Sequence, residues 1–384
     1  MPNDEYRIVL YDDPASLDAA AWDRVVSADV DANPFVRHAY VHAMHASGAA
    51  VPETGWYARF VTCWRGAQLV AIVPLYAKTH SFGEYVFDWA WAQAQERRGV
   101  PYYPKGLVAV PFTPVPGTRI IATDSAARTF AISALLDLVP ALGLSSLHVL
   151  FAPQTQIDAL AGAGMLIRTN VQFHWHNRHY QGFDTFLEAL TQPKRKKIRA
   201  ERRKVQEAGV HLERRIGPEI TQEDWRFFVR CYENTYAAHG ASPYLNLDFF
   251  LRIGREMPHN LLLVRATRNG SPIAGALAFF DRERSALYGR YWGALIHVPC
   301  LHFECCYYQM IEFAIEQGLA EFQGGAQGAH KMARGLDPTV TASAHWMSDA
   351  TTHAAVRRFL ERERDSVVEM IDEMIEHRAL RALG

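Results

Sequence analysis

The fold is decided by the stretch NLLLVRATRNGSPIAGALAFFDRERSALYGRYWGA, residues 260–294. Three apolar runs alternate in it with short polar turns, and the first turn contains Asn269 and Gly270. Because Asn-Gly tolerates the positive φ angles of a tight hairpin, the pattern predicts a meander of three antiparallel strands. The next run, LHFECCYYQMIEFAIEQ, predicts a helix that ends at Gly318, and AEFQ predicts a further strand. Strands followed by a crossing helix and another strand indicate an α+β fold.

A similar pattern occurs earlier in the chain. The runs YARFVTCW, QLVAIVPLYAK and EYVFDWAW lie within residues 57–91, are read as three strands, and have Gly66 in the first turn. Gly66 lies 204 residues before Gly270, and Trp91 lies 201 residues before Trp292. Offsets that agree this closely indicate an internal duplication.

Length and composition support two globular domains. A chain of 384 residues is long enough for two or three domains, and the duplication favours two, residues 1–175 and residues 176–384. Hydrophobic residues make up 49% and charged residues 21%, which excludes a disordered or collagen-like chain. The apolar stretch 131–144 is too short to span a bilayer, and the N-terminus lacks a secretory pattern. Five cysteines without disulfide or metal spacing indicate a cytoplasmic protein.

One strongly basic helix stands out in a chain whose net charge is only −1. The window KRKKIRAERRK, residues 194–204, holds eight bases and one acid, so it carries +7 against −8 for the remainder. Pro193 and Gly209 predict a helix over 193–208. Like charges one turn apart destabilise a helix, and a polyphosphate such as coenzyme A or an RNA backbone would relieve their repulsion. A solvated charged face is the alternative, and duplex DNA is not predicted because no recognition-helix motif is present.

Polar side chains set among glycines and aromatics are concentrated late in the chain. The glycines within 324–328 allow close approach of a ligand to the backbone. His302 and Glu304 could join His330 and His345 in a zinc site, but their spacing matches no metal motif, and no metal is predicted. The other polar or aromatic candidates of this constellation are Arg290, Trp292, Gln327, Lys331 and Arg334.

The first domain contains a second polar group in an aromatic context. Glu84, Asp88 and Lys105 would be costly to bury without partners, so they either pair with one another or line a substrate pocket. The aromatic candidates beside them are Tyr85, Trp89, Tyr102 and Tyr103. Apolar residues at helical spacing over 353–381 predict a long amphipathic C-terminal helical segment packed on the body of the protein.

Taken together, these runs resemble the FemAB-like family of predicted N-acyltransferases, described as peptidoglycan biosynthesis/recognition and part of the GNAT superfamily. The resemblance rests on HSFGEYVFDWAW, YYPK…VPFTP, QFHW, KRKKIRAER, GRYWG, LHFE-x-CYYQ, GAQG-x-HK and SAHW, and extends over residues 20–380. It implies two tandem GNAT-like domains, each a mixed, mainly antiparallel sheet flanked by helices. It also implies transfer of an acyl or aminoacyl group to an amine, with no tightly bound cofactor.

The sequence departs from the family pattern at two positions. Ala329 stands where GAQGEHK has glutamate, and Leu295 replaces the last small residue of the phosphate loop of enzymes that depend on coenzyme A. The second departure favours aminoacyl-tRNA over acyl-CoA as donor, with a peptide or small-molecule amine as acceptor. The alanine at position 329 leaves a second interpretation open, in which the protein is a catalytically silent module that recognises a peptide or cell-wall precursor.

The resemblance suggests a role for each candidate group. Glu304, His302 and His330 are candidates to accept the proton of the attacking amine. The first-domain cluster, together with Arg290, Trp292, Gln327, Lys331, Arg334 and His345, would bind substrate. The donor's phosphates would lie on Lys194, Arg195, Lys197, Arg199, Arg202 and Arg203.

Overall fold

The computed structural model describes residues 6–326, 328–376 and 378–380, and it divides into two compact units. Unit 1 consists of Met1–Asn170 and Val340–Val368, and unit 2 of Val171–Thr339 and Glu369–Gly384.

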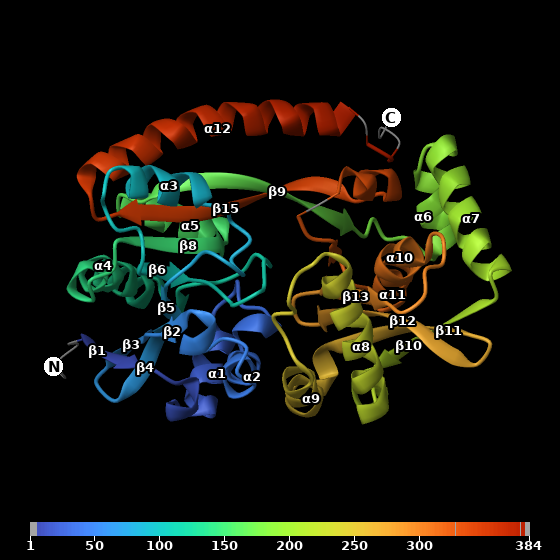
Figure 1. The fold of residues 1–384 in the computed structure, drawn as a ribbon, viewed down its shortest axis with the longest axis horizontal. Coiled ribbons are helices and arrows are strands. Elements are labelled where there is room, and N and C mark those ends of the chain that lie inside the picture. Colours follow the sequence, from blue (N-terminus) through green and yellow to red (C-terminus); the bar gives the residue numbers. More distant parts are fainter. Residues whose placement is uncertain (1–5, 327, 377, 381–384) are drawn as a thin grey trace. The chain divides into compact units, whose positions relative to one another are not determined.

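Three elements contain the points at which the chain passes from one unit to the other. These are the strands β9 (Leu166–His176) and β15 (Asp337–Met347) and the helix α12 (Ala350–Glu376) (Figure 1). The expected boundary near residue 175 lies within β9. The segment 340–368, which we expected in the second domain, belongs to unit 1.

Unit 1 contains two sheets. One is fully antiparallel, in the order β1-β3-β4-β7, and the other has the order β15-β8-β6-β5-β2 within this unit, with β6 and β8 parallel. The strands are β1 (Tyr6–Tyr11), β2 (Trp56–Ala58), β3 (Phe60–Arg65), β4 (Gln68–Val73), β5 (Leu75–Lys78), β6 (Lys105–Val108), β7 (Ile121–Ala122) and β8 (Ser146–Ala152). The helices are α1 (Ala19–Ala28), α2 (His38–Ala46), α3 (Trp89–Arg97), α4 (Ser125–Ala141) and α5 (Gln154–Gly162).

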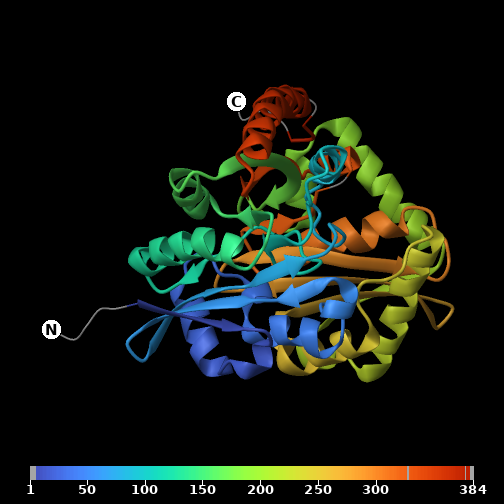
Figure 2. The same cartoon turned by 60° about the vertical axis from the view of Figure 1, so that its left-hand side comes forward.

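Helices cover both faces of the four-stranded sheet of unit 1. Figure 2 shows α1 and α2 on one side of the blue strands and α4 on the other, and both α1 and α4 contact β4. The inner face of α4 supplies Leu135 and Val139, which pack in one core cluster with Val73 and Leu147. The core thus lies between the strands and the apolar side of α4.

The strand that we predicted at 84–91 does not form. Residues 79–88 make a loop, and residues from Trp89 onward make α3. Alternate side chains of this loop are buried, as they would be in a strand. The alternation of apolar and polar residues in the sequence therefore cannot distinguish the two. The strands β6 and β8 are parallel, and α4 lies between them in the chain. The strand before this helix, which we expected at residues 84–91, is therefore β6.

Unit 2 follows the predicted meander. Its strands are β10 (Val210–Ile216), β11 (Leu261–Arg268), β12 (Ser271–Asp281), β13 (Ala286–Ala294) and β14 (Glu321–Gln323), in the order β10-β11-β12-β13-β14-β9. Among these described strands, β13 and β14 are the one parallel pair. The predicted turn is present, since Asn269 and Gly270 both have positive φ, as a two-residue hairpin turn with Asn-Gly requires.

The helices of unit 2 pack on this sheet. They are α6 (Phe183–Ala189), α7 (Gln192–Glu207), α8 (Gln222–Ala238), α9 (Leu247–Glu256), α10 (Leu301–Phe303) and α11 (Gln309–Glu316). A π-helical turn, η6 (Glu304–Tyr308), joins α10 to α11, and Gly318 follows with positive φ, as predicted. Phe280 of β12 stacks edge-on against Phe313 of α11 in the unit 2 core. Both domains are thus α+β, and each has a mixed, mainly antiparallel sheet flanked by helices.

Candidate active site

The candidate site of unit 2 lies where β13 separates from β14. The two strands pair only at Ala286, Leu287 and Tyr288, so the rest of β13 has lost that neighbour. A β-bulge at Arg290 also interrupts the pairing of β13 with β12. A cavity of about 290 Å³ opens there, lined by Gly289 through Trp292 and by residues of α10, η6 and the loop after β14. The backbone edge of β13 is therefore presented to a ligand.

Two glycines shape the strand that borders this cavity. At Gly293, a Cβ atom would lie 2.0 Å from the carbonyl oxygen of Cys231 in α8, so only glycine permits this approach of strand and helix. At Gly289, a Cβ would lie 3.1 Å from the ring of Phe322. The glycines of GRYWGA thus fix where β13 lies against its neighbours.

Two histidines face the cavity from different segments. His302 comes from α10, and His330 comes from η7 (Ala329–Arg334), a 3-10 turn in the glycine-rich loop. Their ring centroids are 6.4 Å apart, and the Tyr307 hydroxyl lies 3.1 Å from Nε2 of His330. Burial lowers the pKa of His302 to about 4, and burial and the Arg334 guanidinium lower the pKa of His330. Both imidazoles are therefore neutral at pH 7 and able to accept a proton.

A lysine completes the cavity wall. Lys331 is buried, its ammonium group donates to the carbonyl oxygen of Gly325 at 3.2 Å, and it lies 5.8 Å from the centroid of the Phe173 ring. Burial lowers its pKa to about 8, so most of it is still charged at pH 7. Arg290 and Trp292 line the same cavity, as do the sequence-predicted His302, His330 and Lys331.

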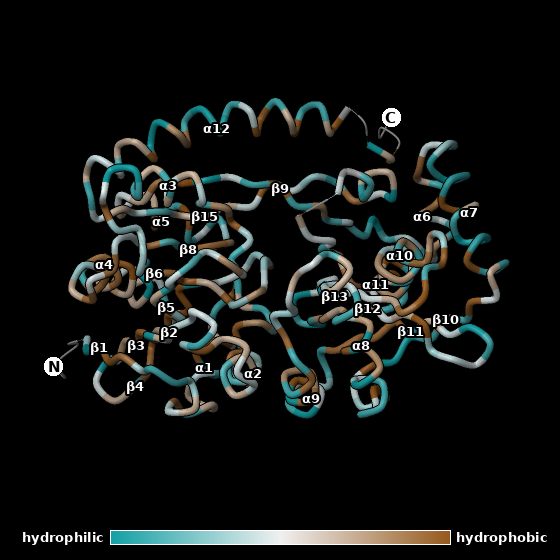
Figure 3. The backbone as a smooth tube through the Cα atoms, viewed as in Figure 1, coloured by the Kyte–Doolittle hydropathy of each residue, from teal (hydrophilic) through white to brown (hydrophobic). Residues whose placement is uncertain are grey.

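The predicted basic helix is α7, which Figure 3 shows largely in the hydrophilic colour. Ile198, Glu201 and Val205 are buried at helical spacing and form its inner side. The exposed cations form a surface that we call the outer face, composed of Lys196, Lys197, Arg199, Arg203 and Lys204. Lys194 and Arg195 are half-buried, and Asp184 lies 3.7 Å from Arg199. Three of the six predicted phosphate-binding cations, Lys197, Arg199 and Arg203, thus lie on this solvent-facing surface.

Arg202 differs from its neighbours because it points to the body of the unit. Its guanidinium pairs with Glu304 at 3.1 Å and with Glu312 at 3.2 Å, and Gln309 also donates to Glu304 at 2.9 Å. Glu304 is 2% exposed and is not part of the cavity wall. The structure therefore gives Arg202 and Glu304, which we expected in donor binding and in catalysis, a shared ion pair.

Arg334 is also engaged internally. It is 2% exposed, and its Nη2 donates to both carboxylate oxygens of Glu201 of α7, at 2.8 and 2.9 Å. Gln327, another predicted substrate contact, lies outside the described residues. Sequence reasoning missed Glu201 and Tyr307, although Glu201 carried a signal as the single acid of the basic run, in phase with Ile198 and Val205.

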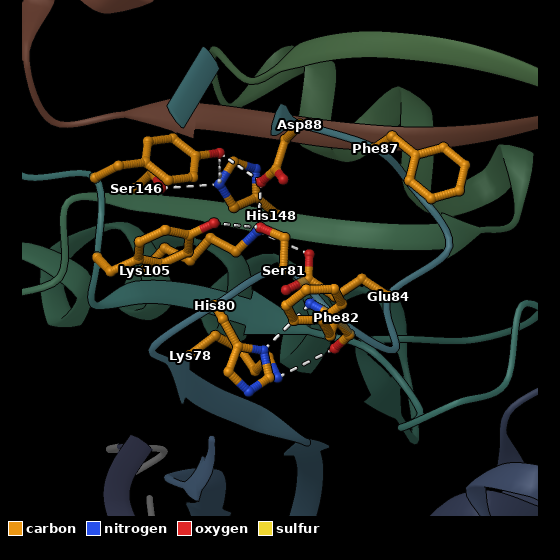
Figure 4. Close-up of polar contacts among 12 residues, drawn as sticks. Lys78, His80, Ser81, Phe82, Glu84, Phe87, Asp88, Lys105, Ser146 and His148 are labelled. Carbon is orange, nitrogen blue, oxygen red and sulfur yellow. Dashed lines mark hydrogen bonds and ion pairs between the residues drawn. The ribbon is translucent and has the colours of Figure 1, made fainter. Parts of the chain in front are cut away.

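The polar group of unit 1 is a buried ion cluster (Figure 4). The ammonium group of Lys105 donates to Ser81 at 2.7 Å, to Glu84 at 2.8 Å and to Asp88, and these three residues hold the loop 79–88 on the sheet. Burial raises the pKa of Glu84 to about 7. Burial acts in the same direction on Asp88, but Lys105 prevails and lowers the pKa of Asp88 to about 2. Of the two alternatives for Glu84, Asp88 and Lys105, the structure therefore shows that these charges pair with one another.

The same loop turns aromatic side chains outward. Residues 81, 84, 86 and 88 are buried, whereas Phe82, Tyr85, Phe87 and Trp89 are exposed. Tyr102 is buried and donates to Asp88 at 2.5 Å, and the Tyr103 hydroxyl lies 2.8 Å from that of Ser81. The ion cluster thus supports an exposed aromatic surface, of which Tyr85 and Trp89 are predicted members.

His345 belongs to unit 1 and not to the unit 2 cavity. It lies on β15 opposite His148 on β8, with the two Nδ1 atoms 2.8 Å apart and both rings buried. Ser146 and Ser343 hydrogen-bond the Nε2 atoms at 2.8 and 2.9 Å. Burial lowers the pKa of His148 to about 3 and the pKa of His345 well below its usual value.

Two further findings concern the described part of the chain as a whole. No group of three or more His, Cys, Asp or Glu side chains in it is arranged to hold a metal ion. No helix among the same residues combines the length and the apolar character needed to cross a bilayer.

Comparison with known proteins gives a family and a fold. A family model, FemAB-like, described as peptidoglycan biosynthesis/recognition, matches residues 13–382. No curated protein matches the chain. The crystal structure of FemX aligns with a TM-score of 0.53 and 12% identity, covering 89% of this chain and 98% of that one. The structure of L-PGS from Bacillus licheniformis aligns with a TM-score of 0.54 and 10% identity, covering 89% and 97%.

A third structure gives the same result. The C-terminal domain of a putative lysylphosphatidylglycerol synthetase from Agrobacterium fabrum aligns with a TM-score of 0.51 and 10% identity, covering 89% of this chain and 95% of that one. At such low identities these structures bear on the fold alone. This chain thus shares the fold of these structures, and its own two α+β units are accompanied by the long C-terminal helix α12.

Proposed function

The chain belongs to the FemAB-like family, a group of acyl and aminoacyl transferases, and on this premise we propose that it is an N-acyltransferase that uses aminoacyl-tRNA. The acceptor in this proposal is an amine of a peptide or small molecule. The observation that carries the proposal is the cavity at β13, where neutral histidines and a cationic lysine surround the edge of the strand from which β14 has separated. Such a site suits aminolysis of an activated ester, which needs a carbonyl to be polarised and a proton to be removed.

The outer face of α7 supports a polyanionic donor. Its exposed cations would neutralise several phosphates of one nucleic acid strand, and release of the counterions favours such binding. Acyl-CoA fits less well because the backbone N–H of Leu295 bonds to the carbonyl oxygen of Ile273 at 2.8 Å. This N–H lies in the segment where a coenzyme A phosphate loop would be. Because it already donates to Ile273, it is not available to a phosphate.

The reaction follows from the groups that line the cavity. The acceptor nitrogen attacks the carbonyl carbon of the donor ester, and the negative charge develops on the carbonyl oxygen. Backbone N–H groups of β13 beyond Tyr288 and the ammonium group of Lys331 would stabilise that oxygen. The C–O bond to the tRNA ribose then breaks, an amide remains, and the ribose oxygen takes up a proton.

The proton of the attacking amine would pass to an imidazole. His302 and His330 are the candidates, since both line the cavity and both are neutral at pH 7. The burial that keeps His302 neutral lowers its pKa to about 4 and so makes it a weak base, which favours His330. The carboxylate of Glu304 is held in an ion pair with Arg202. Glu304 would therefore act on the reaction only by positioning Arg202, not by accepting the proton. No covalent enzyme intermediate is required.

The acceptor would bind to unit 1 in this proposal. The exposed rings of Tyr85 and Trp89 offer an apolar contact surface, and the buried cluster of Glu84, Asp88 and Lys105 keeps the loop that carries them in place. Tyr102 and Tyr103 would act from beneath that loop, through Asp88 and Ser81.

The donor assignment is tested by reversing charge on the outer face. Arg199→Glu/Arg203→Glu changes two exposed arginines one helical turn apart and leaves Arg202 with its partners. The matched control, Arg226→Glu/Arg230→Glu, makes the same change at the same spacing on the exposed side of α8. Binding of charged tRNA and of coenzyme A would be measured across a salt series.

We expect tRNA binding to weaken at least about 10-fold in the α7 variant and to lose part of its salt dependence, because phosphate contacts are removed. The α8 control should bind as the wild type does. Coenzyme A binding without tRNA binding would replace the donor by acyl-CoA. Binding of neither, with no transfer to any amine, would support a recognition module and contradict the proposal.

A further inference from the structure

We propose that Glu201 is a positioning residue that holds η7, with His330 and Lys331, in place at the cavity and thereby links the outer face of α7 to the candidate active site. The link consists of described contacts within unit 2 and is independent of where the acceptor binds. Its consequence for the reaction rate rests on the proposed function.

Glu201 is built into the interior although it lies in the most basic segment of the chain. It is 7% exposed and faces inward with Ile198 and Val205. Both of its carboxylate oxygens accept hydrogen bonds from Arg334, at 2.8 and 2.9 Å, and Oε2 also accepts one from the Tyr308 hydroxyl. Both bonds from Arg334 come from its Nη2, so two donor groups, this nitrogen and the Tyr308 hydroxyl, hold the buried carboxylate with charge-assisted hydrogen bonds.

Arg334 passes this constraint to the backbone of the cavity loop. Its Nη1 donates to the carbonyl oxygen of His330 at 2.7 Å, and its guanidinium lies 3.5 Å from the centroid of the Phe303 ring. Arg334 is the last residue of η7, and His330 and Lys331 are in the first turn. One side chain therefore clamps both ends of the short turn that presents the two cavity residues.

The residue next to Glu201 makes the complementary link. Arg202 pairs with Glu304, the first residue of η6, whose turn also contains the cavity residues Cys306 and Tyr307. Consecutive residues of opposite charge on α7 thus hold the two segments that carry the cavity side chains. π-Helical turns such as η6 are frequent at functional sites.

The electrostatic effect of Glu201 reaches the same histidine. Burial, Arg334 and Lys331 lower the pKa of His330, and Glu201 acts against them and raises it. Loss of the Glu201 charge would therefore lower the pKa of His330 further and release the Arg334 clamp. A purely structural role in helix packing would change stability without this specific change at His330.

The test compares Glu201→Gln with Glu207→Gln, the same substitution at an exposed position of the same helix. The first readout is the titration of His330 by NMR on protein labelled with ¹³C-histidine, without any ligand. Glu201→Gln should lower the His330 pKa and move its resonance, and Glu207→Gln should match the wild type. An unchanged His330 in Glu201→Gln would overturn the proposal.

The second readout separates positioning from donor binding. With a charged tRNA pool as probe, Glu201→Gln should bind within about two-fold of the wild type, because the outer face is intact. Its transfer rate should fall by up to about 100-fold, as expected for misplaced reacting groups. Absence of tRNA binding to the wild type would contradict the proposed donor, whereas the ligand-free titration of His330 would still decide the role of Glu201.

A milder variant covers the case in which Glu201→Gln fails to fold. Tyr308→Phe removes only the hydroxyl that donates to Glu201 and keeps the ring in the core. It should shift the His330 resonance in the same direction by a smaller amount. A folded Tyr308→Phe protein with wild-type His330 titration and wild-type transfer rate would count against the link.

Discussion

Buried charges decide the local structure of both units, residue by residue. In unit 1, Lys105 has no exposed surface and is surrounded by acceptors from the loop 79–88, which also accepts a hydrogen bond from Lys78 at Phe82, so buried cations fix the loop conformation. In unit 2, Glu201 and Arg202 do the same for the segments that carry the cavity side chains. In the sequence, pairing of Lys105 with Glu84 and Asp88 was one of two alternatives. The partners of Arg202 and Glu201, 102 and 133 residues away, were not predicted.

Replacing Lys105 tests the first of these clusters. Lys105→Met leaves two carboxylates, Glu84 and Asp88, buried without their cation, and we expect unfolding by urea to show a loss of about 3–5 kcal/mol. The triple variant Lys105→Met/Glu84→Gln/Asp88→Asn removes all three charges and should recover part of that loss. Equal stability of Lys105→Met and wild type would mean that the cluster does not hold the loop.

The buried pair of His148 on β8 and His345 on β15 should make the free energy of unfolding depend on pH. The pKa of His148 is about 3 in the folded protein and near 6.5 in the unfolded chain, and the pKa of His345 is lowered too. The unfolded chain therefore binds more protons below pH 6.5, so stability is full above that pH and falls as the pH decreases.

Glu84 acts in the opposite direction, because its raised pKa weakens stability as the pH rises from 4.5 to 7. The measurement is therefore a difference between wild type and His148→Gln/His345→Gln, with thermal unfolding recorded from pH 7.5 to 4.5. The double variant should lose less stability over that range than the wild type. Parallel curves would show that the pair does not titrate with unfolding.

At the scale of elements, the strand β13 is the part of the chain on which the candidate site depends. It pairs with β12 along most of its length, leaves β14 after Tyr288, and packs directly on α8 at Gly293. The meander 260–294 was predicted correctly because its turn chemistry and apolar runs are local. The separation of β13 from β14 was not predicted. It depends on where the helical segment 301–316 places the start of β14 beside β13, and that is set by tertiary packing.

Gly293→Ala tests the contact of β13 with α8. A methyl group there would meet the Cys231 backbone, which cannot move aside as a flexible side chain does, and we expect a loss of at least about 1–3 kcal/mol by thermal or urea unfolding. Gly182→Ala is the control, because a Cβ at Gly182 meets nothing within 4 Å and its φ is −178°. A tolerated Gly293→Ala would argue against the close approach.

At the scale of the whole molecule, each unit combines an antiparallel run with one parallel strand pair and an intervening helix, β6–α4–β8 in unit 1 and β13–α11–β14 in unit 2. The hairpin turns at Gly66 and Gly270 agree with the duplication read from the sequence. The other offset does not join equivalent strands, because Trp91 lies in α3 and Trp292 in β13. Unit 1 is nevertheless discontinuous in sequence. It requires β15 beside β8 and the first part of α12, whose Val356 and Leu360 pack with Trp91.

Dissection of the chain tests this organisation. A fragment that ends at residue 175 lacks the strand that pairs with β8 and the helix that covers Trp91, so we expect it to aggregate or to give no cooperative unfolding transition by circular dichroism. The same fragment joined by a flexible linker to residues 340–368 should be soluble and unfold cooperatively. A stable fragment 1–175 would contradict the division into units.

The sequence by itself determined the α+β class, the meander of 260–294, the basic helix 193–208 and the family resemblance. These features depend on neighbouring residues: turn glycines, helical spacing and charge density act within a few positions. Tertiary structure alone decided that 84–91 is a loop and the start of a helix, that Glu304 and Arg334 pair with α7, and that His345 lies in unit 1. Those outcomes depend on which distant side chains meet in the folded chain, since a buried charge takes whichever partner the topology brings to it.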